Sequence, residues 1–495
     1  MNPKFNNLVI FEMANNHQGS VEHGLEIIRL LGEAARKHHI NAAVKFQYRD
    51  LDTMIHPDYK NRTDVKHIPR FLSTRLTSDQ FYTMVSAVRE EGMLTMCTPF
   101  DEKSVDLCMD HGIDIIKIAS CSATDWPLLE KVAETGRPVI ISSGGKTFSD
   151  MDKIYNFLMH RNVDFAMLHC VGLYPVGYEY VQLDCIDKMK NRYPHIPVGY
   201  SGHEDPNDFT VVQMAIAKGA TIVERHIGLA TDTIKLNAYS TDARNVGDWL
   251  TAIENARKIC GEPNKKYISQ EEITSMNELA RGCYAARKIK QGEKIERDDV
   301  FFAMPCENGQ TTSGVFLPGM IASKDYDVNE AIYEKRAVSI TSDTRSIIHD
   351  VKGMLNEAHI TVGNEFELEL SHHYGLEHFR NYGVTMINII NREYCKKLLI
   401  VLPGQKHPVH YHKVKEESFQ VLYGTLTLTL DGKETEVKEG QVITVERNVP
   451  HAFTSKDGCV FEEVSTTHIK NDSYYEDPAI AHLDVMERKT ILKNW

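Results

Sequence analysis

PVGYSGHEDPNDFTVVQMAIAKGATIVERHI, residues 197–227, is the clearest structural signal in the chain. A short apolar run ends in Ser201 and His203, a segment with apolar residues at helical spacing follows, and a second apolar run ends in Glu224 and His226. Runs that are apolar throughout are typical of strands buried on both faces, as in parallel sheets covered by helices. We therefore interpret this stretch as a strand–helix–strand unit.

The same unit recurs through the first half of the chain. Helical patterns separate the apolar runs, and many of these patterns end at or near a glycine. Eight consecutive units of this kind predict an α/β fold, a (β/α)8 TIM barrel. A doubly wound open sheet is the alternative, although it rarely needs eight consecutive units of one type. The eight expected strands are Leu8–Met13, Ala43–Tyr48, Leu94–Pro99, Ile113–Ser120, Pro138–Ser143, Phe165–Cys170, Pro197–His203 and Thr221–Ile227.

Two smaller regions follow the predicted barrel domain, which we assign to residues 1–268. Short strands and turns in residues 276–338 predict a small β-rich domain. Residues 359–495 alternate apolar and polar side chains, most clearly in TLTLTL, which is followed by Asp431–Gly432 and KETEV. Because Asp-Gly between alternating runs is a strong hairpin signal, the third domain is predicted to be an all-β barrel or jelly roll.

Composition narrows the class of protein. The 495 residues contain 56 Lys and Arg and 69 Asp and Glu, a formal net charge of −13, which argues against nucleic-acid and anionic-membrane partners. The ten cysteines include no CxxC pair, so we expect neither a disulfide framework nor a cysteine zinc site. No apolar run approaches the roughly 20 residues of a membrane helix, and the N-terminus lacks signal-peptide features. We expect a cytoplasmic protein.

The expected carboxyl ends of the barrel strands carry polar side chains that suit one site. These ends form the active-site mouth of a barrel. Lys45 and Lys117, with several hydroxyl side chains, suit a phosphate-bearing ligand. His203 and His226 lie on adjacent strands and could share a divalent metal, with Glu12 on the neighbouring first strand. A single histidine or lysine here could be structural, so the interpretation depends on the convergence of the whole set.

The strand motifs FEMANNHQGS, AVKFQY, CTPF, IKIAS, ISSG, LHCVGLYP, GYSGH and VERHI resemble those of the sialic-acid synthases, including pseudaminic- and legionaminic-acid synthases. The resemblance covers residues 5–338, and the second region is similar to the family's antifreeze-like (SAF) β-clip domain. It implies that phosphoenolpyruvate (PEP) condenses with an open-chain amino sugar or other aldose, releasing phosphate and giving a 3-deoxy-2-keto sugar acid. It also implies Mn or Mg in the barrel, and a homodimer in which the SAF loop Ala303–Gln310 approaches the partner's barrel.

The resemblance also implies roles for individual positions. His203 and His226 match the metal ligands, and Glu12, Lys45 and Lys117 the catalytic positions, with the role of Glu12 open between stabilising a cation and steering a proton. Positions expected to contact PEP or the sugar are Gln47, Thr98, Phe100, Ser120, Ser142, Tyr174, Ser201, Glu224 and Asn237.

Three departures from the family pattern concern the sugar. Gly172 replaces an asparagine that contacts PEP, Asn237 an aspartate that recognises the sugar, and Met304 an arginine that reaches a partner's sugar. We therefore expect an aldose other than N-acetylmannosamine. Two alternatives stay open: a synthase for a phosphorylated aldose, against which no additional Arg/Lys cluster is visible, and a catalytically silent sugar-responsive binding protein.

The third domain carries a second metal-binding pattern. Gly404, His410, His412, Glu417 and Gly424 reproduce the first cupin motif, and Gly440 with His451 reproduces the spacing of the second. His410 and His412 alternate along a strand and thus point to one side. Three histidines and a carboxylate suit Mn, Fe, Ni or Zn. The domain resembles the D-lyxose ketol-isomerase type of cupin, so we expect it to isomerise, epimerise or bind the sugar.

Overall fold

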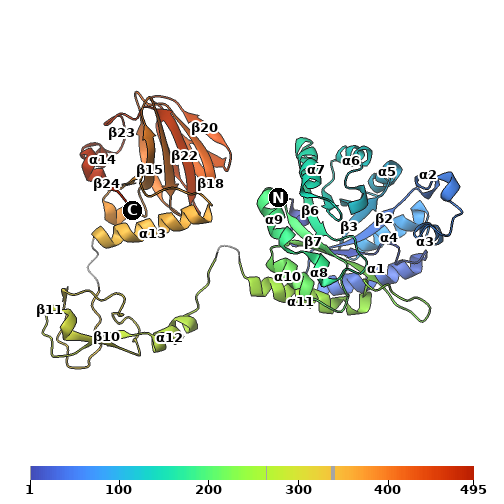
Figure 1. Cartoon of the computed structure of the whole chain (residues 1–495), viewed down its shortest axis with the longest axis horizontal. Helices are drawn as coiled ribbons and strands as arrows, with labels where there is room; N and C mark the ends of the chain where they lie inside the picture. The colour runs from blue at the N-terminus through green and yellow to red at the C-terminus, as the bar shows by residue number, and fades with distance from the viewer. Residues whose placement is uncertain (1, 263–264, 336–339) are drawn as a thin grey trace. The chain divides into compact units, whose positions relative to one another are not determined.

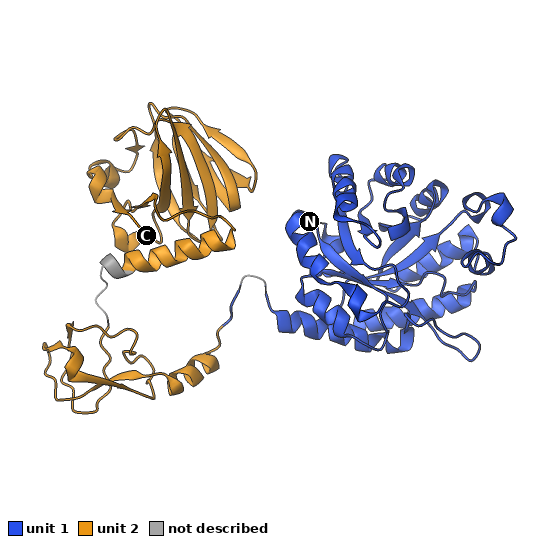
Figure 2. Cartoon of the chain, viewed as in Figure 1, with its two compact units in different colours: residues 1–267 blue, residues 268–495 orange. Residues whose placement is uncertain are grey.

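Eight parallel strands close into a barrel in the first unit of the chain, residues 1–267 (Figures 1 and 2). The computed structural model describes residues 2–262, 265–335 and 340–495. Each strand pairs with the next along the chain, and the first pairs with the eighth, so the sheet has no free edge. This confirms the predicted (β/α)8 barrel. The strands are β1 Val9–Glu12, β2 Ala42–Tyr48, β3 Leu94–Pro99, β4 Ile115–Ile118, β5 Val139–Ser142, β6 Phe165–Cys170, β7 Val198–Gly202 and β8 Ile222–Gly228.

Amphipathic helices cover the barrel. Side-chain caps fix where several of them begin: Ser20 accepts a hydrogen bond from the backbone of His23, and Thr77 and Gln80 form a capping box. Their apolar faces pack on the outward-facing strand residues, as Ile28 and Leu31 do in one buried cluster with Val44. The covering helices are α1 Val21–Lys37, α4 Ser78–Glu90, α5 Glu102–Asp110, α6 Trp126–Ala133, α7 Phe148–His160, α9 Asp184–Arg192, α10 Thr210–Ala217 and α11 Val246–Cys260.

The inside of the barrel changes character along each strand. Near the amino ends, inward-facing residues form an apolar layer that includes Ile10 and Ile222. Glu12 lies two residues after Ile10 on β1, so its side chain also points into the barrel. Glu224 and His226 lie two and four residues after Ile222 on β8 and point inward for the same reason. The fold therefore gathers the polar side chains of several strands at one mouth.

The second unit, residues 268–495, begins with helix α12 (Gln270–Leu279) and a small β region. Strand β10 (Gly282–Ala285) pairs with β12 (Val300–Ala303), and β11 (Lys294–Ile295) pairs with β13 (Met320–Ile321). Residues such as Cys283, Ile295 and Tyr326 form the core of this region. Residues 336–338 of the expected second domain lie outside the described residues.

An antiparallel β fold occupies the C-terminal part, as predicted. Asp431 and Gly432, both at positive φ, form the turn of the hairpin between β18 (Glu417–Leu430) and β19 (Lys433–Lys438). Helix α13 (Ile340–Glu357) packs Val351 and Leu355 into one apolar cluster with residues of the sheet. The strands are β14 Glu367–Ser371, β15 Val384–Asn391, β16 Tyr394–Val401, β17 Lys406–Tyr411, β18 Glu417–Leu430, β19 Lys433–Lys438, β20 Val442–Val445, β21 His451–Thr454, β22 Cys459–Thr466, β23 Tyr474–Tyr475 and β24 Lys489–Leu492.

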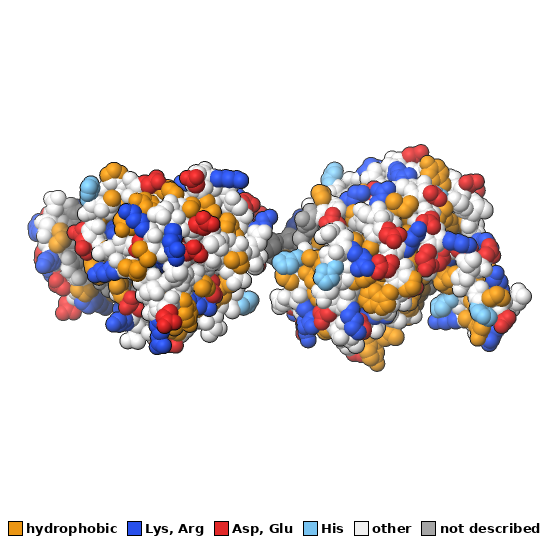
Figure 3. All heavy atoms as spheres, turned by 90° about the horizontal axis from the view of Figure 1, so that it is seen from above, with side chains coloured by type: hydrophobic (Ala, Val, Ile, Leu, Met, Phe, Trp, Pro, Cys, Tyr) orange, Lys and Arg blue, Asp and Glu red, His pale blue; other side chains and the backbone are white. Residues whose placement is uncertain are grey.

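The surface carries mixed charge. Figure 3 shows acidic and basic side chains interspersed with apolar ones over the visible face. Among the described residues, no helix combines the length and apolar character that a membrane span requires.

Candidate functional sites

A buried ion-pair network joins four barrel strands at the mouth. Lys45 on β2 donates to Glu12 on β1 and, at 2.8 Å, to Glu224 on β8. Lys117 on β4 lies 3.4 Å from the other oxygen of Glu224 and donates a hydrogen bond to Ser142 on β5. Burying such charges costs several kcal/mol of solvation for each ion, so their retention suggests a site with a ligand.

The two lysines differ in their electrostatics. Burial lowers the pKa of Lys117 to about 8, although Glu224 opposes the shift. Burial also acts on Lys45, but Glu12 and Glu224 outweigh it and raise the pKa of Lys45 above its ordinary value. Although burial raises the pKa of Glu224, Lys117 and Lys45 outweigh it and hold that pKa well below normal. Glu224 is thus a fixed anion, and Lys117 is the group that titrates near neutral pH.

Hydroxyl groups surround this network as the sequence predicts. Ser201 donates to Glu224 at 2.8 Å, and Ser120 accepts a hydrogen bond from the backbone of Gly144 at 2.9 Å. The hydroxyl of Thr98 is buried and has no hydrogen-bond partner among the described residues. With Ser142, the structure brings these predicted side chains to the same mouth, where short donors could hold a phosphate.

His203 and His226 lie together beside the ion-pair network. Their ring centroids are 5.3 Å apart, and the ring of Tyr174 lies 4.0 Å from that of His203. Burial is the largest cause that lowers the pKa of both histidines, to about 4 for His203, so both rings are neutral. His203 donates from Nδ1 to the carbonyl of Val171 at 3.0 Å, which leaves its Nε2 lone pair available. Neutral imidazoles of this kind fit a divalent metal.

Two further residues at the mouth were missed by the sequence analysis. The guanidinium of Arg49 is sandwiched between the rings of Phe71 and Phe100, at 4.1 and 3.9 Å, and donates to Gln47 at 2.6 Å. Its buried Nε has no hydrogen-bond partner among the described residues. The position of Arg49 directly after the strand motif AVKFQY is the sequence signal that could have identified it. Phe100 and Gln47, both predicted to contact PEP or the sugar, thus position the guanidinium of Arg49.

The second missed residue is Tyr239, in the loop after β8. Its ring lies 5.1 Å from that of His226 and 5.2 Å from that of Tyr174. Asn237, the predicted sugar contact, accepts a hydrogen bond from the backbone of Tyr239 at 3.2 Å. Asn237 therefore shapes the loop that brings Tyr239 to the mouth. Met304 is exposed in the small β region.

The C-terminal sheet contains the second predicted cluster. Ligand atoms of His410, His412 and His451 all lie within 4.8 Å of one another. Each Nδ1 faces a backbone carbonyl, and the shortest of these hydrogen bonds is the one from His412 to Asp472 at 2.6 Å. The Nε2 atoms of His412 and His451 are buried without a hydrogen-bond partner in the described part of the chain. Convergent, unsatisfied Nε2 atoms fit a transition metal.

Glu417, the predicted fourth ligand, faces the same point. Its carboxylate oxygens lie 3.4 Å from Nε2 of His412 and 3.3 Å from Nε2 of His451. Lys415 also forms an ion pair with Glu417, and that cation is the main partner that outweighs burial and keeps the pKa of Glu417 well below normal. Glu417 is therefore an anion that lies close to the histidine cluster and also pairs with Lys415.

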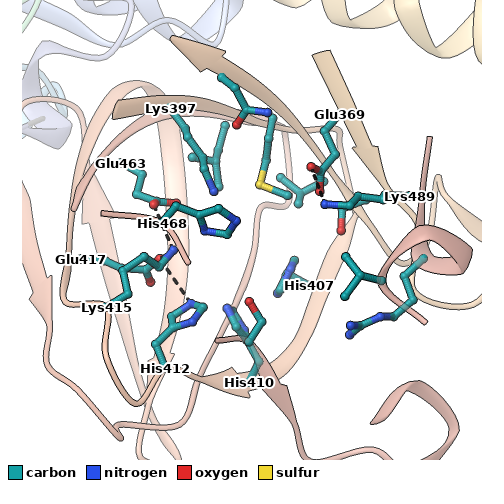
Figure 4. A pocket seen from close by; sticks show the side chains of 18 of the residues that line it. Glu369, Lys397, His407, His410, His412, Lys415, Glu417, Glu463, His468 and Lys489 are labelled. Atoms are coloured by element: carbon teal, nitrogen blue, oxygen red, sulfur yellow. Dashed lines mark hydrogen bonds and ion pairs between the residues drawn. The ribbon is translucent and has the colours of Figure 1, made fainter. Parts of the chain in front are cut away.

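A cavity of about 370 Å³ opens beside these histidines (Figure 4). Its volume lies within the range of small-molecule sites. His407, which the cupin spacing did not identify, also lines it, with its ring 4.6 Å from that of His410. The hydroxyl of Tyr475 and Nε2 of His373 form a hydrogen bond of 2.9 Å near the same rings.

Comparisons with known proteins match the barrel and the C-terminal β domain to two different families. Residues 33–265 match the model of the NeuB family, and residues 397–462 match that of the cupin domain. A solved structure from Chromobacterium violaceum, assigned as spore coat polysaccharide biosynthesis protein E, is 41% identical with a TM-score of 0.63, covering 66% of this chain and 97% of that one.

Two curated relatives have named products. Human N-acetylneuraminate-9-phosphate synthase is 28% identical over 59% of this chain and 81% of its own length. N,N'-diacetyllegionaminic acid synthase of Campylobacter jejuni is 25% identical over 66% of this chain and 99% of its own length. Both relatives are synthases of sugar acids or their phosphates by name.

Proposed function

Because the chain belongs to the NeuB family, we propose that its barrel condenses PEP with an open-chain aldose to give a 3-deoxy-2-keto sugar acid and phosphate. The buried network of Glu12, Lys45, Lys117 and Glu224 beside two neutral histidines carries this proposal. It joins cations for an anionic substrate to a pair of metal ligands at one mouth.

In the proposed reaction, C3 of PEP forms a bond to the aldehyde carbon, and positive charge develops at C2. Water adds at C2, and the bond between C2 and the phosphate oxygen breaks to release phosphate. Lys45 and Lys117, with Ser142 and Ser201, hold the phosphate and neutralise its charge as it leaves. A divalent metal, when held by His203 and His226, supplies Lewis-acid polarisation of the aldehyde.

The test is phosphate release from PEP by the full chain with Mn²⁺ and a panel of aldoses. Release that depends on both the aldose and the metal supports the proposal. Absence of release across a broad panel would favour a catalytically silent sugar-binding protein.

Arg49 favours a second candidate, a synthase for a phosphorylated aldose. A buried guanidinium with an unpartnered Nε at the mouth could hold a second phosphate. Paired aldoses with and without a 6-phosphate separate the two candidates. If the phosphorylated form is the substrate, Arg49→Met should raise its KM while the KM of PEP changes little.

We also propose that the C-terminal domain is a metal-binding cupin that isomerises or epimerises the sugar. His410, His412, His451 and Glu417 would hold the metal. Incubation of the full chain with metal and aldoses, followed by NMR, would detect ketose formation or inversion at C2. His412→Ala should lose the metal and the conversion together. Metal bound without conversion would leave a binding role, and absence of bound metal would reject the site.

Finally, we propose that residues 276–338 form an SAF domain and that two chains form a homodimer. In this arrangement the loop 303–310 of one chain approaches the barrel mouth of the other. The resemblance of residues 5–338 to the sialic-acid synthases supports this proposal.

A further inference from the structure

Lys397 on β16 is a buried lysine without a direct ion pair in the described part of the chain. Its side chain points into the cupin cavity and is 6% exposed (Figure 4). Among the described residues, no hydrogen bond or ion pair joins its ammonium group to another side chain. Burial without a partner costs a charged group much of its solvation energy, so such a group is expected to have a ligand.

Glu463, the acidic residue opposite Lys397 in the sheet, makes its direct contacts with other side chains. Glu463 lies opposite Lys397 on β22, but its carboxylate accepts hydrogen bonds from Lys415 at 3.1 Å and Ser465 at 3.0 Å. The other neighbour across the sheet is Asn388, which carries no charge. Burial raises the pKa of Glu463, but the charges of Lys397 and then Lys415 outweigh it and lower that pKa, so Glu463 attracts Lys397 from a distance. Among the described residues, no carboxylate forms a direct ion pair with Lys397.

The cavity as a whole has an excess of cations. Five Lys or Arg side chains and four Glu side chains line it, although the whole chain carries a net charge of −13. Two of the cations are committed to carboxylates: Lys489 to Glu369 at 3.1 Å, and Lys415 to Glu417 and Glu463. Any metal at the histidine cluster would add to the excess.

His468 provides a neutral polar group next to Lys397. Burial and then the charge of Lys397 lower the pKa of His468 to about 3, so its ring is neutral. Its Nδ1 is buried and has no hydrogen-bond partner among the described residues. Figure 4 shows both side chains pointing into the cavity, with His410 and His412 across it.

We propose that Lys397 and His468 bind the anionic group of a sugar derivative whose opposite end faces His410, His412 and His451. This inference rests on the proposed sugar-handling function of the cupin and narrows its ligand from a neutral aldose to an anionic sugar. The anion is a phosphate or a carboxylate, because a lysine ammonium can bind either. A sugar phosphate and a sugar acid of the kind the barrel would produce both have this chemistry.

The experiment is calorimetric titration of the full chain with Mn²⁺ and three probes: D-mannose, D-mannose 6-phosphate and N-acetylneuraminate. A barrel variant, His203→Ala, serves as the background to reduce binding at the other site. Lys397→Met removes the charge and keeps the length of the side chain. Lys396→Met is the matched control, because Lys396 precedes Lys397 on β16, is partly exposed and pairs with Glu462 at 3.1 Å.

We expect at least one anionic probe to bind more tightly than D-mannose, and Lys397→Met to weaken that probe by about tenfold or more. Lys396→Met should bind like the background protein. The probe that responds identifies phosphate or carboxylate as the anion. Equal affinity for the neutral and anionic probes, no binding of either anionic probe, or equal effects of the two lysine substitutions would overturn the inference.

The same titration keeps the inference separate from the proposed isomerase function. It measures binding, so it does not require turnover of the sugar. Lys397-dependent binding in the titration, with no ketose formed in the NMR assay, would reject isomerisation and retain the anion site. Ketose formation from neutral aldoses, at rates that Lys397→Met does not change, would support isomerisation and reject the anion site.

Discussion

His203 and His226 combine burial, neutrality and proximity, the properties that metal ligation requires. We expect His203→Ala or His226→Ala to reduce phosphate release by at least about 100-fold, because each would remove a proposed metal ligand rather than a supporting group. Their Tm should change little, because both residues lie at the mouth beyond the apolar layer of the barrel. His195→Ala is the control, because His195 is exposed in the connection between α9 and β7. Full activity of either mouth variant with metal present would contradict the assignment.

Lys117 gives the barrel a predicted pH dependence. Burial lowers its pKa to about 8, so the ammonium is present below that pH and is lost as the pH rises through it. Only the charged form of Lys117 attracts the phosphate of PEP. The pH dependence of kcat/KM for PEP reports the pKa values of groups in the free enzyme. We therefore expect kcat/KM for PEP to decline above about pH 8, while Lys45 stays charged. A profile that is flat to pH 9.5 would count against a role for Lys117 in binding PEP.

Strand irregularity decides which histidines reach the cupin cavity. His407 and His410 are three residues apart, so a regular strand would point them to opposite faces. The register of β17 against β21 shifts between them, and both rings line the cavity. Alternation therefore predicts His410 and His412 from the sequence but excludes His407. The barrel strands β1 and β8 pair without such a shift, and Glu12, Glu224 and His226, predicted from the carboxyl ends of the strands, lie at one mouth in the structure.

Helix α13 shows a second limit of the sequence analysis. Residues 341–353, TSDTRSIIHDVKG, are mostly polar, and the sequence alone indicates a polar connection between the second and third domains. In the structure, Val351 and Leu355 join the apolar cluster of the cupin sheet. A short apolar stripe becomes interpretable only when the surface that it covers is known.

The packing of α13 leads to a prediction about stability. Leu355 is buried against the sheet, so Leu355→Ala should lower the free energy of unfolding of the C-terminal region by about 2–4 kcal/mol. Asn356→Ala, at the next and exposed position, should change it by less than about 0.5 kcal/mol. Denaturant unfolding monitored by circular dichroism would measure both. Equal stability of the two variants would show that α13 contributes little to the fold.

At the scale of the molecule, one chain carries the two sites for which we propose sugar chemistry. The barrel and the cupin each have their own core, and each gathers buried histidines beside buried Lys–Glu pairs. One chain that carries both sites keeps their ratio at one to one. This arrangement suits two reactions on related sugars, and it predicts that inactivating the cupin site leaves condensation of a preformed aldose intact.

Assembly can be tested through Met304, an exposed residue in the loop 303–310. If this loop completes the partner's barrel, Met304→Asp should lower phosphate release, and the full chain should sediment as a dimer at micromolar concentration. Mixing Met304→Asp chains with His203→Ala chains should then restore activity, because a mixed dimer pairs an intact barrel with an intact loop from its partner. A loop that acts on its own barrel could not give this recovery, since each chain would keep its defect. The matched control mixes His203→Ala with His226→Ala, in which every barrel is damaged and no recovery is expected. A monomer in sedimentation, or equal activity of the mixed and unmixed proteins, would reject the shared site.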